Sequence, residues 1–201
     1  MDTLYIVIPA YNESENIKRT IGEWYPVVEK HNGGGASRLV IINDGSRDDT
    51  YEIASAECET RPLLIVLTKP NGGHGSTVLY GYRYALENGA DYIFQTDSDG
   101  QTDPAEFEKF WQIREGYDAI FGNRTSRGDG FSRAVVEKVL CAVLWTCFHV
   151  SVPDANAPFR LMKADYVAEY LPLMPENYNL PNALLTAFGA YFHRKIRFIP
   201  I

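Results

Sequence analysis

The chain has 201 residues, of which 45% are hydrophobic, and it carries a formal net charge of -7 at pH 7. This length and composition suit one globular domain with a complete core, and the acidic balance argues against a nucleic-acid-binding protein, which would present a basic face. An anionic small ligand is not excluded, because a metal ion and a few local arginines can reverse the charge inside one cleft.

Strand-like apolar runs alternate with helix-like segments along the chain. The runs are continuous and rich in Ile, Val and Leu, as expected for parallel strands that are covered on both faces. They cover Leu4–Pro9, Leu39–Asn43, Leu63–Thr68, Tyr92–Asp97 and Ala119–Gly122. The alternation predicts an α/β protein with an open, mostly parallel sheet and helices on both faces, in which ligands bind beyond the carboxyl ends of the strands.

Helix starts are indicated between these runs. Asn12 with Glu15, and Ser46 with Asp49, resemble capping boxes. Asp103-Pro104 combines an N-cap residue with a proline at the first helical position. The sequence therefore predicts a helix directly after the first, second and fourth strands.

A longer apolar stretch, Val135–Val152, repeats its hydrophobic residues at helical spacing. This pattern favours a buried helix. The alternative is a helix that lies on a membrane surface, although the stretch has few basic residues to meet anionic lipid. No apolar stretch reaches the length of a membrane span.

Cellular location is indicated by two features. The chain runs directly into the strand-like segment at Leu4, so we expect no signal peptide. The three cysteines, Cys58, Cys141 and Cys147, have no metal-site spacing, and their odd number favours free thiols in a reducing compartment. We therefore expect a cytoplasmic protein.

The strongest chemical signal is Asp97-Ser98-Asp99-Gly100-Gln101. It places two carboxylates one residue apart at the mouth of a buried strand. A few oxygen ligands, with room left for water and phosphate, suit Mg²⁺ or Mn²⁺, which could bridge a diphosphate and stabilise it as a leaving group. Taken alone, the segment is also an ordinary solvated turn, since Asp and Gly are common turn residues.

Two further polar segments follow strands. Asp44, within Asn43-Asp44-Gly45-Ser46, can accept a hydrogen bond from a ring N–H of a nucleobase, or it can close an Asx-turn. The segment Asn71–Thr77 contains three glycines before a helix, which let backbone N–H groups approach a ligand. It lacks the Lys-Ser/Thr ending of a nucleotide P-loop, so by itself it indicates a flexible turn.

In their order and spacing, these segments resemble the family 2 glycosyltransferases with the GT-A fold, and most of all the dolichyl- and polyprenyl-phosphate sugar transferases among them. The likeness runs over nearly the whole chain. It rests on Ile8–Glu13, Asn43–Ser46, Asn71–Gly75, Thr96–Gln101, Gly122–Arg124 and Asp154–Arg160. The resemblance implies an inverting transfer of a sugar from a UDP- or GDP-linked donor to a polyprenyl or dolichyl phosphate.

The resemblance also implies a donor site and a metal site. Asp44 would contact the base, with Pro9 and Tyr11 at the same subsite. The other motif residues that it assigns to nucleotide-sugar binding are Glu13, Asn71, Gly75, Asp97 and Ser98. The metal, Mg²⁺ or Mn²⁺, would be held by Asp99 as main ligand, with Asp97 beside it and Gln101 as a further ligand.

On the acceptor side, the resemblance implies that Arg124 and Arg133 bind donor or acceptor phosphates. A sugar hydroxyl acceptor would need a general base, for which Asp154 is the candidate. A lipid phosphate is already an anion at neutral pH, and Asp154 would then position it. Each residue also has an ordinary role open to it, a helix-flanking cap for Asp154 and surface ion pairs for the arginines.

The chain departs from the family pattern at three places. Asn43 replaces the commoner Asp, which leaves one carboxylate at the base subsite, and Pro158 replaces the usual Gly of the acceptor loop. The chain also stops at Ile199–Ile201, where a strand would lead into a further loop. We therefore expect a single GT-A domain, 1–201, with a nucleotide-binding half (1–122) and an acceptor half (123–201) cut short. A segment beyond residue 201 would hold it at the inner membrane face.

Other functions stay open. The same donor site could serve a polysaccharide or surface-glycan transferase with a sugar hydroxyl as acceptor. A binding module that only holds a nucleotide sugar is the alternative from another class, and the presence of Asp99 speaks against it. A dinucleotide-binding oxidoreductase is disfavoured, because no G-x-G-x-x-G follows the first strand.

Overall fold

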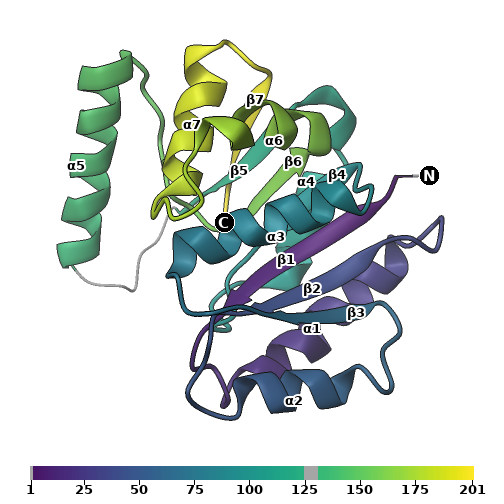
Figure 1. Ribbon diagram of the computed structural model, residues 1–201. Coiled ribbons are helices and arrows are strands. Elements are labelled where there is room, and N and C mark those ends of the chain that lie inside the picture. The colour runs from purple at the N-terminus through teal and green to yellow at the C-terminus, as the bar shows by residue number, and fades with distance from the viewer. Residues whose placement is uncertain (1, 125–130) are drawn as a thin grey trace.

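The computed structural model describes residues 2–124 and 131–201, the segment 131–138 by its backbone alone. One sheet runs through the described residues, in the strand order β3-β2-β1-β4-β6-β5-β7 (Figure 1). Its strands are β1 Leu4–Ala10, β2 Arg38–Asn43, β3 Leu64–Thr68, β4 Tyr92–Gln95, β5 Ala119–Asn123, β6 Arg160–Lys163 and β7 Ile196–Pro200. The strand alternation read from the sequence is confirmed, and the two strands nearest the C-terminus complete the sheet.

The sheet is mostly parallel. β1 pairs in parallel with β2 and β4, β2 with β3, and β5 with β7, whereas β6 runs antiparallel to both β4 and β5. The strand order reverses direction at β1 and β4, which makes a topological switch point. In open α/β sheets, ligands bind at the carboxyl ends of the strands at this point.

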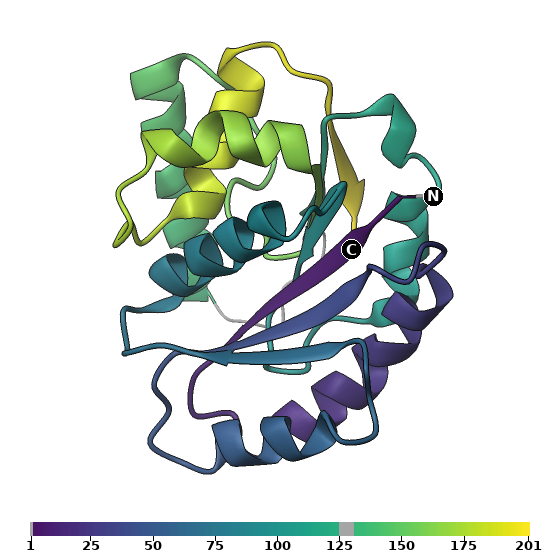
Figure 2. The ribbon, with the colours of Figure 1, turned by 45° about the vertical axis from the view of Figure 1, so that its right-hand side comes forward.

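Helices cover both faces of the sheet (Figures 1 and 2). One face carries α1 and α2 with the short α4, and the other carries α3, α6 and α7. The α-helices are α1 Ile17–Lys30, α2 Thr50–Glu57, α3 His74–Glu87, α4 Phe107–Trp111, α5 Phe131–Phe148, α6 Ala164–Tyr170 and α7 Pro181–Tyr191. Short 3₁₀ turns η1 Pro104–Glu106, η2 Arg114–Gly116 and η3 Leu171–Leu173 stand beside them.

Strand β1 shows why a continuous apolar run suits the centre of this sheet. All its residues are buried, and because side chains alternate along a strand, they fill two cores. Leu4, Ile6 and Ile8 pack in the core that holds Trp24 of α1. Tyr5 and Val7 pack in the core beneath α3. The run therefore fixes the layered arrangement on both sides at once.

The helix starts agree with the sequence in one case of three. Asp103 caps η1, accepting from the Ala105 N–H at 2.9 Å. The two predicted capping boxes are wrong: α1 begins at Ile17 and α2 at Thr50, and neither is capped by a side-chain hydrogen bond. Instead the loops bond to each other, with the Asn12 N–H donating to Ser46 Oγ at 3.0 Å and the Arg47 N–H donating to Asn12 Oδ1 at 2.8 Å.

Helix α5 departs from the favoured expectation of a buried helix. It stands at the side of the molecule, and α7 is its main neighbour (Figure 1). Of its described side chains, Leu144 is buried, while Val139, Val143 and Trp145 are exposed. Among the described residues, no helix combines the length and apolar character that crossing a membrane requires.

Candidate functional site

A cavity of about 370 Å³ opens at the switch point, beyond the carboxyl ends of the first four strands. Segments that follow β1, β2, β3 and β4 meet there, because parallel strands bring their carboxyl ends to one edge of the sheet. The cavity is lined by Pro9, Ala10, Tyr11, Glu13, Asp44, Asn71, Gly73, His74, Thr77, Asp97, Ser98 and Asp99. Eight of the residues that the sequence singles out for donor or metal binding are therefore brought together.

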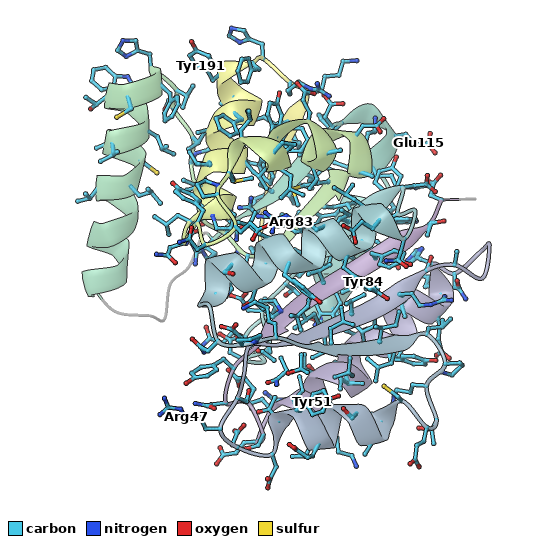
Figure 3. The ribbon with its side chains drawn as sticks, in the orientation of Figure 1. Arg47, Tyr51, Arg83, Tyr84, Glu115 and Tyr191 are labelled. Atoms are coloured by element: carbon cyan, nitrogen blue, oxygen red, sulfur yellow. The ribbon has the colours of Figure 1, made fainter. Side chains whose placement is uncertain are left out.

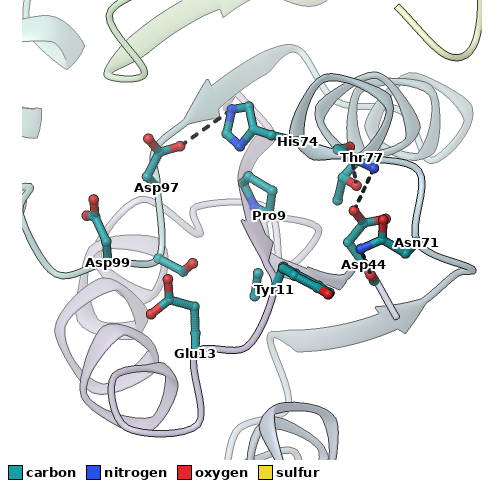
Figure 4. A pocket seen from close by; sticks show the side chains of 12 residues that line it. Pro9, Tyr11, Glu13, Asp44, Asn71, His74, Thr77, Asp97 and Asp99 are labelled. Atoms are coloured by element: carbon teal, nitrogen blue, oxygen red, sulfur yellow. Dashed lines mark hydrogen bonds and ion pairs between the residues drawn. The ribbon is translucent and has the colours of Figure 1, made fainter. Parts of the chain in front are cut away.

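The cavity has two chemically different ends (Figure 4). Asp97, Asp99 and Glu13 gather at one end, so that negative charge is concentrated there. Asp44 lies at the other end with Asn71, and Tyr11 lies between the two ends. An elongated ligand with an anionic, metal-binding part and a hydrogen-bonding ring suits this distribution.

At its own end, Asp44 organises the loop after β3. Its two carboxylate oxygens accept the Gly72 and Gly73 N–H groups, each at 2.9 Å, and Lys69 Nζ forms an ion pair with it. Burial opposes ionisation, but the bonds from Lys69 and Gly72 outweigh it, so the pKa of Asp44 lies below its ordinary value. Asp44 is therefore held ionised, and part of its acceptor capacity is already used by the protein.

Two glycines let the loops come this close. Gly45 has a φ of 63°, and a Cβ there would lie 2.8 Å from the Asn71 backbone nitrogen. Asn71 in turn donates through Nδ2 to the Asp44 carbonyl at 2.9 Å. Gly75 was expected to contact the ligand, but it does not line the cavity. Its Cα faces the backbone of Tyr178 and Asn179, where a Cβ would come within 2.3 Å of an oxygen.

At the acidic end, Asp97 has a carboxylate oxygen without a hydrogen-bond partner. This oxygen, Oδ1, is buried, and His74 Nε2 lies 3.8 Å from it. Burial raises the pKa of Asp97 and the Asp99 charge raises it further, while His74, Arg124 and Arg160 act against both. A carboxylate that is buried without a full set of donors is the kind of group that a cation stabilises.

The remaining metal candidates lie close by but are incomplete as a site. Asp99 Oδ1 accepts the backbone N–H of Gln101 at 3.0 Å, and Gln101 itself is exposed and outside the cavity lining. Within the part of the chain that the structure describes, no three His, Cys, Asp or Glu side chains are placed to hold a metal together. The orphaned Asp97 oxygen and the hard oxygen donors fit Mg²⁺ or Mn²⁺ that takes its other ligands from elsewhere.

Arg124 and Asp154 form one unit next to the cavity. Arg124 Nε and Nη2 donate to Asp154 Oδ2 and Oδ1 at 2.8 and 3.1 Å, and Asp154 is almost fully buried. The Asn156 N–H donates to the same carboxylate at 3.1 Å. The side chain of Arg133, the other predicted phosphate ligand, lies outside the described residues.

Arg160 adds a fully buried cation under the site. It donates through Nε and Nη2 to the Ala157 carbonyl and through Nη1 to the Asn182 carbonyl, and its guanidinium lies 4.8 Å from the ring centre of Phe121. Burial lowers its pKa, and the charges of Asp154 and Asp97 are among those that act in the opposite direction. Arg160 therefore contributes positive potential beneath the acidic end.

Three contributors to the site were missed from the sequence. Lys69 gave one signal, a cation directly after a strand, and Thr77 stood at the end of the glycine segment without being assigned a role. We expected the glycine loop to turn flexibly; instead His74 begins α3, and its half-exposed ring lines the cavity. Helix periodicity could have revealed that His74 and Thr77 point the same way.

Comparison with solved structures shows the fold. Glucosyl-3-phosphoglycerate synthase from Mycobacterium tuberculosis, solved with Mn²⁺, UDP-glucose and phosphoglyceric acid, superposes with a TM-score of 0.71 and 19% sequence identity. The match covers 99% of this chain and 69% of that one. The fold is therefore the GT-A fold that the sequence predicts.

Curated relatives and a family model complete the comparison. An undecaprenyl-phosphate 4-deoxy-4-formamido-L-arabinose transferase of Photorhabdus laumondii is 27% identical over 173 residues, or 83% of this chain and 50% of that protein. A UDP-N-acetylglucosamine–dolichyl-phosphate N-acetylglucosaminyltransferase of Methanococcus voltae is 28% identical over 151 residues, or 67% of this chain and 57% of that protein. The chain thus spans about half the length of these relatives. The family model for glycosyl transferase family 2 matches residues 5–171, most of the chain, and this protein therefore belongs to that family.

Proposed function

We propose that this chain binds a nucleoside-diphosphate sugar in the switch-point cavity and transfers the sugar, with inversion, to a polyprenyl or dolichyl phosphate. One observation carries the proposal: a single cavity has a carboxylate cluster at one end and a preorganised hydrogen-bonding loop at the other. The relatives from Photorhabdus laumondii and Methanococcus voltae are named as an undecaprenyl-phosphate and a dolichyl-phosphate sugar transferase. Their names support the choice of acceptor.

In the donor subsite, we assign the base to the end with Asp44 and Asn71. Asp44 Oδ2 accepts the Gly73 N–H, and a carboxylate oxygen can take a second hydrogen bond from a base N–H. Tyr11, which is 42% exposed at the cavity wall, is available to contact the base or the ribose. Both UDP and GDP carry such a ring N–H, so the test includes both.

At the acidic end, Asp97 and Asp99 would hold Mg²⁺ or Mn²⁺. Glu13 lines the same cavity, and Gln101 follows Asp99 by two residues in the sequence. A bound divalent ion supplies charge neutralisation for the departing diphosphate. The protein's own part is to keep the half-buried Asp97 and the exposed Asp99 beside each other, with the Arg124 and Arg160 cations within electrostatic reach of Asp97. These residues prearrange the electrostatics where negative charge accumulates during transfer.

For the acceptor, the Arg124–Asp154 unit favours a phosphate over a sugar hydroxyl. A general base must be able to take up a proton, and the bidentate bond from Arg124 stabilises the charged form of Asp154. A lipid phosphate is already ionised at neutral pH and needs no base. The Arg124–Asp154 unit then positions the acceptor segment, and the half made by 123–201 acts as the acceptor half.

The test is an incubation of the protein with UDP- and GDP-linked sugars and Mn²⁺, with and without undecaprenyl phosphate, followed by measurement of released nucleoside diphosphate. We expect release from one donor class that depends on both the metal and the lipid phosphate. The variant Asp99→Asn should abolish it, and Asp49→Asn, which alters an exposed carboxylate just before α2, should not. Release that requires a glycan hydroxyl instead of lipid phosphate would contradict the acceptor assignment.

A further inference from the structure

Thr20 places a hydroxyl on the largely apolar buried face of α1. This helix packs on the same face of the sheet as α2, whose Tyr51 is labelled in Figure 3. Thr20 is 1% exposed. The other buried residues of the helix are Ile17, Ile21, Trp24, Tyr25 and Val28. A buried hydroxyl costs free energy unless it is hydrogen-bonded, so the partner of this group indicates what it does.

The Thr20 hydroxyl bonds outside its own helix. Threonines within helices commonly donate to the carbonyl four residues earlier. Thr77, Thr146 and Thr186 do so in this protein, at 3.0, 2.8 and 2.9 Å. Thr20 Oγ1 instead donates to the Ser98 carbonyl at 3.0 Å, across 78 residues of sequence. The hydroxyl therefore ties α1 to the segment that follows β4.

Ser98 stands between the two carboxylates of the proposed metal site, in the carboxylate loop formed by residues 96–102. The carbonyl that Thr20 bonds belongs to the peptide unit between Ser98 and Asp99. Ser98 is buried, whereas Asp99 is exposed and reaches the cavity. Figure 4 shows the start of α1 beside Asp99. The bond from Thr20 therefore fixes the backbone directly before a candidate metal ligand.

The rest of the carboxylate loop is closed at its base and covered at its tip. Thr96 Oγ1 donates to Thr102 Oγ1 at 2.8 Å, which joins the two ends of the loop. At the tip, Gly100 has a φ of 72°, and a Cβ there would collide with the Arg19 guanidinium. Helix α1 thus contacts the loop on both sides of Asp99.

We propose that Thr20, assisted by Arg19, is a positioning residue that sets the geometry in which Asp97 and Asp99 take up a divalent ion. The inference rests on the proposed function, because it concerns the same metal site. Mg²⁺ requires near-ideal octahedral geometry, so a small displacement of one carboxylate weakens its binding. Groups that orient metal ligands from outside the coordination shell typically contribute about 10- to 100-fold to metal affinity. Thr20 acts in this way through the Ser98 backbone.

Hydrogen–deuterium exchange tests the anchor in the metal-free protein. In Thr20→Val, which keeps the branched shape and loses the hydroxyl, the amides of residues 96–102 should exchange about fivefold faster or more. Thr20→Ser, which keeps the hydroxyl, should restore slow exchange. Arg19→Ala alters an exposed side chain, so it tests the loop without touching the core, and we expect exchange about threefold faster. Thr186→Val removes an equally buried hydroxyl from α7 and should leave the loop unchanged.

Calorimetry with UDP and with GDP, each with Mg²⁺ or Ca²⁺, tests the effect on the metal. In Thr20→Val, the gain in nucleotide affinity from Mg²⁺ should fall about tenfold or more. The gain from Ca²⁺, whose coordination is flexible, should fall less than about threefold. Nucleotide affinity without metal should not change. A general loss of stability would not separate the two ions, and urea denaturation checks that each variant is folded.

The outcomes separate this inference from the proposed function. If the wild type shows a Mg²⁺-dependent gain and Thr20→Val shows an equal one, only the inference fails. Exchange of residues 96–102 that is unchanged in both Thr20→Val and Arg19→Ala also overturns it. If Thr20→Val does not fold, unchanged exchange in Arg19→Ala is enough to overturn it. A wild-type protein without any metal-dependent gain contradicts the proposed function, and the inference fails with it.

Discussion

Arg124 and Asp154 are joined by two hydrogen bonds, of 2.8 and 3.1 Å, across a separation of 30 residues in sequence. The Asp154 side chain is 1% exposed, whereas the Arg124 side chain is 30% exposed. The arginine thus joins the end of β5 to the segment that precedes β6. Arg124 therefore fixes the position of Asp154 in addition to supplying a positive charge.

Replacing Arg124 with alanine should destabilise the protein, because the buried Asp154 carboxylate loses two donors. We expect a loss of about 1–3 kcal/mol in the free energy of unfolding, measured by urea denaturation. Arg124→Lys should lose less, since it keeps the charge but not the planar fork. Lys109→Ala, which removes an exposed ion pair with Glu106, is the control and should cost at most about 1 kcal/mol. Equal losses in Arg124→Ala and Lys109→Ala would show that the buried pair is not structural.

Asp44→Asn should lower the free energy of unfolding at neutral pH and reduce its dependence on pH in the acid range. The folded protein holds the pKa of Asp44 below its ordinary value of 3.8, so the ionised carboxylate stabilises the fold above pH 3.8, and this contribution is lost as the pH falls through the lowered pKa. We expect the variant to be less stable by about 1–3 kcal/mol at neutral pH, with the difference shrinking on acidification. Urea titrations over a pH series measure it. A difference that stays constant with pH would contradict this account.

Asp99→Ala should remove most of the metal-dependent gain in nucleotide affinity. Carboxylate and phosphate oxygens together complete the shell of Mg²⁺ or Mn²⁺, so metal and nucleotide should bind with mutual support. Isothermal calorimetry with UDP and with GDP, each with and without Mn²⁺, should show a gain that falls about tenfold or more in the variant. Asp49→Ala, at an exposed helix end, should leave the gain intact. If both variants keep the gain, the metal lies elsewhere.

Gly75→Ala should destabilise the start of α3 by steric conflict rather than by a lost ligand contact. Its new Cβ would lie 2.3 Å from the Tyr178 carbonyl oxygen, and backbone cannot yield as a flexible side chain does. We expect a melting temperature lower by several degrees, equivalent to about 1–3 kcal/mol. Gly22→Ala in α1 meets nothing within 4 Å and should be neutral or stabilising by up to about 1 kcal/mol, since alanine favours helix. A Gly75→Ala variant as stable as Gly22→Ala would refute the conflict.

Much of the site follows from the sequence. Continuous apolar runs predict parallel strands, and parallel strands bring their carboxyl ends to one edge. This principle alone places Asp44, Asp97 and Asp99 near one another. The motif spacing adds Pro9 and Tyr11, which the structure also brings to the cavity. The apolar runs and the polar motifs that follow them are local patterns, so they can be recognised from the sequence alone.

The tertiary structure alone decided which groups face each other. Asn12 and Ser46 look like helix caps locally, yet they bond across two loops, because the neighbouring strands β1 and β2 deliver those loops to the same place. Asp44 gains Lys69 as a partner for the same reason. The helix pattern of α5 predicts one apolar stripe toward a core, but it cannot say that α7 would be its main neighbour, or that Val139, Val143 and Trp145 would stay exposed. The hydrogen-bond partners of loop residues and the burial of a helix face depend on contacts between distant segments. The free energies of these contacts are set by the packed sheet and not by any local run of residues.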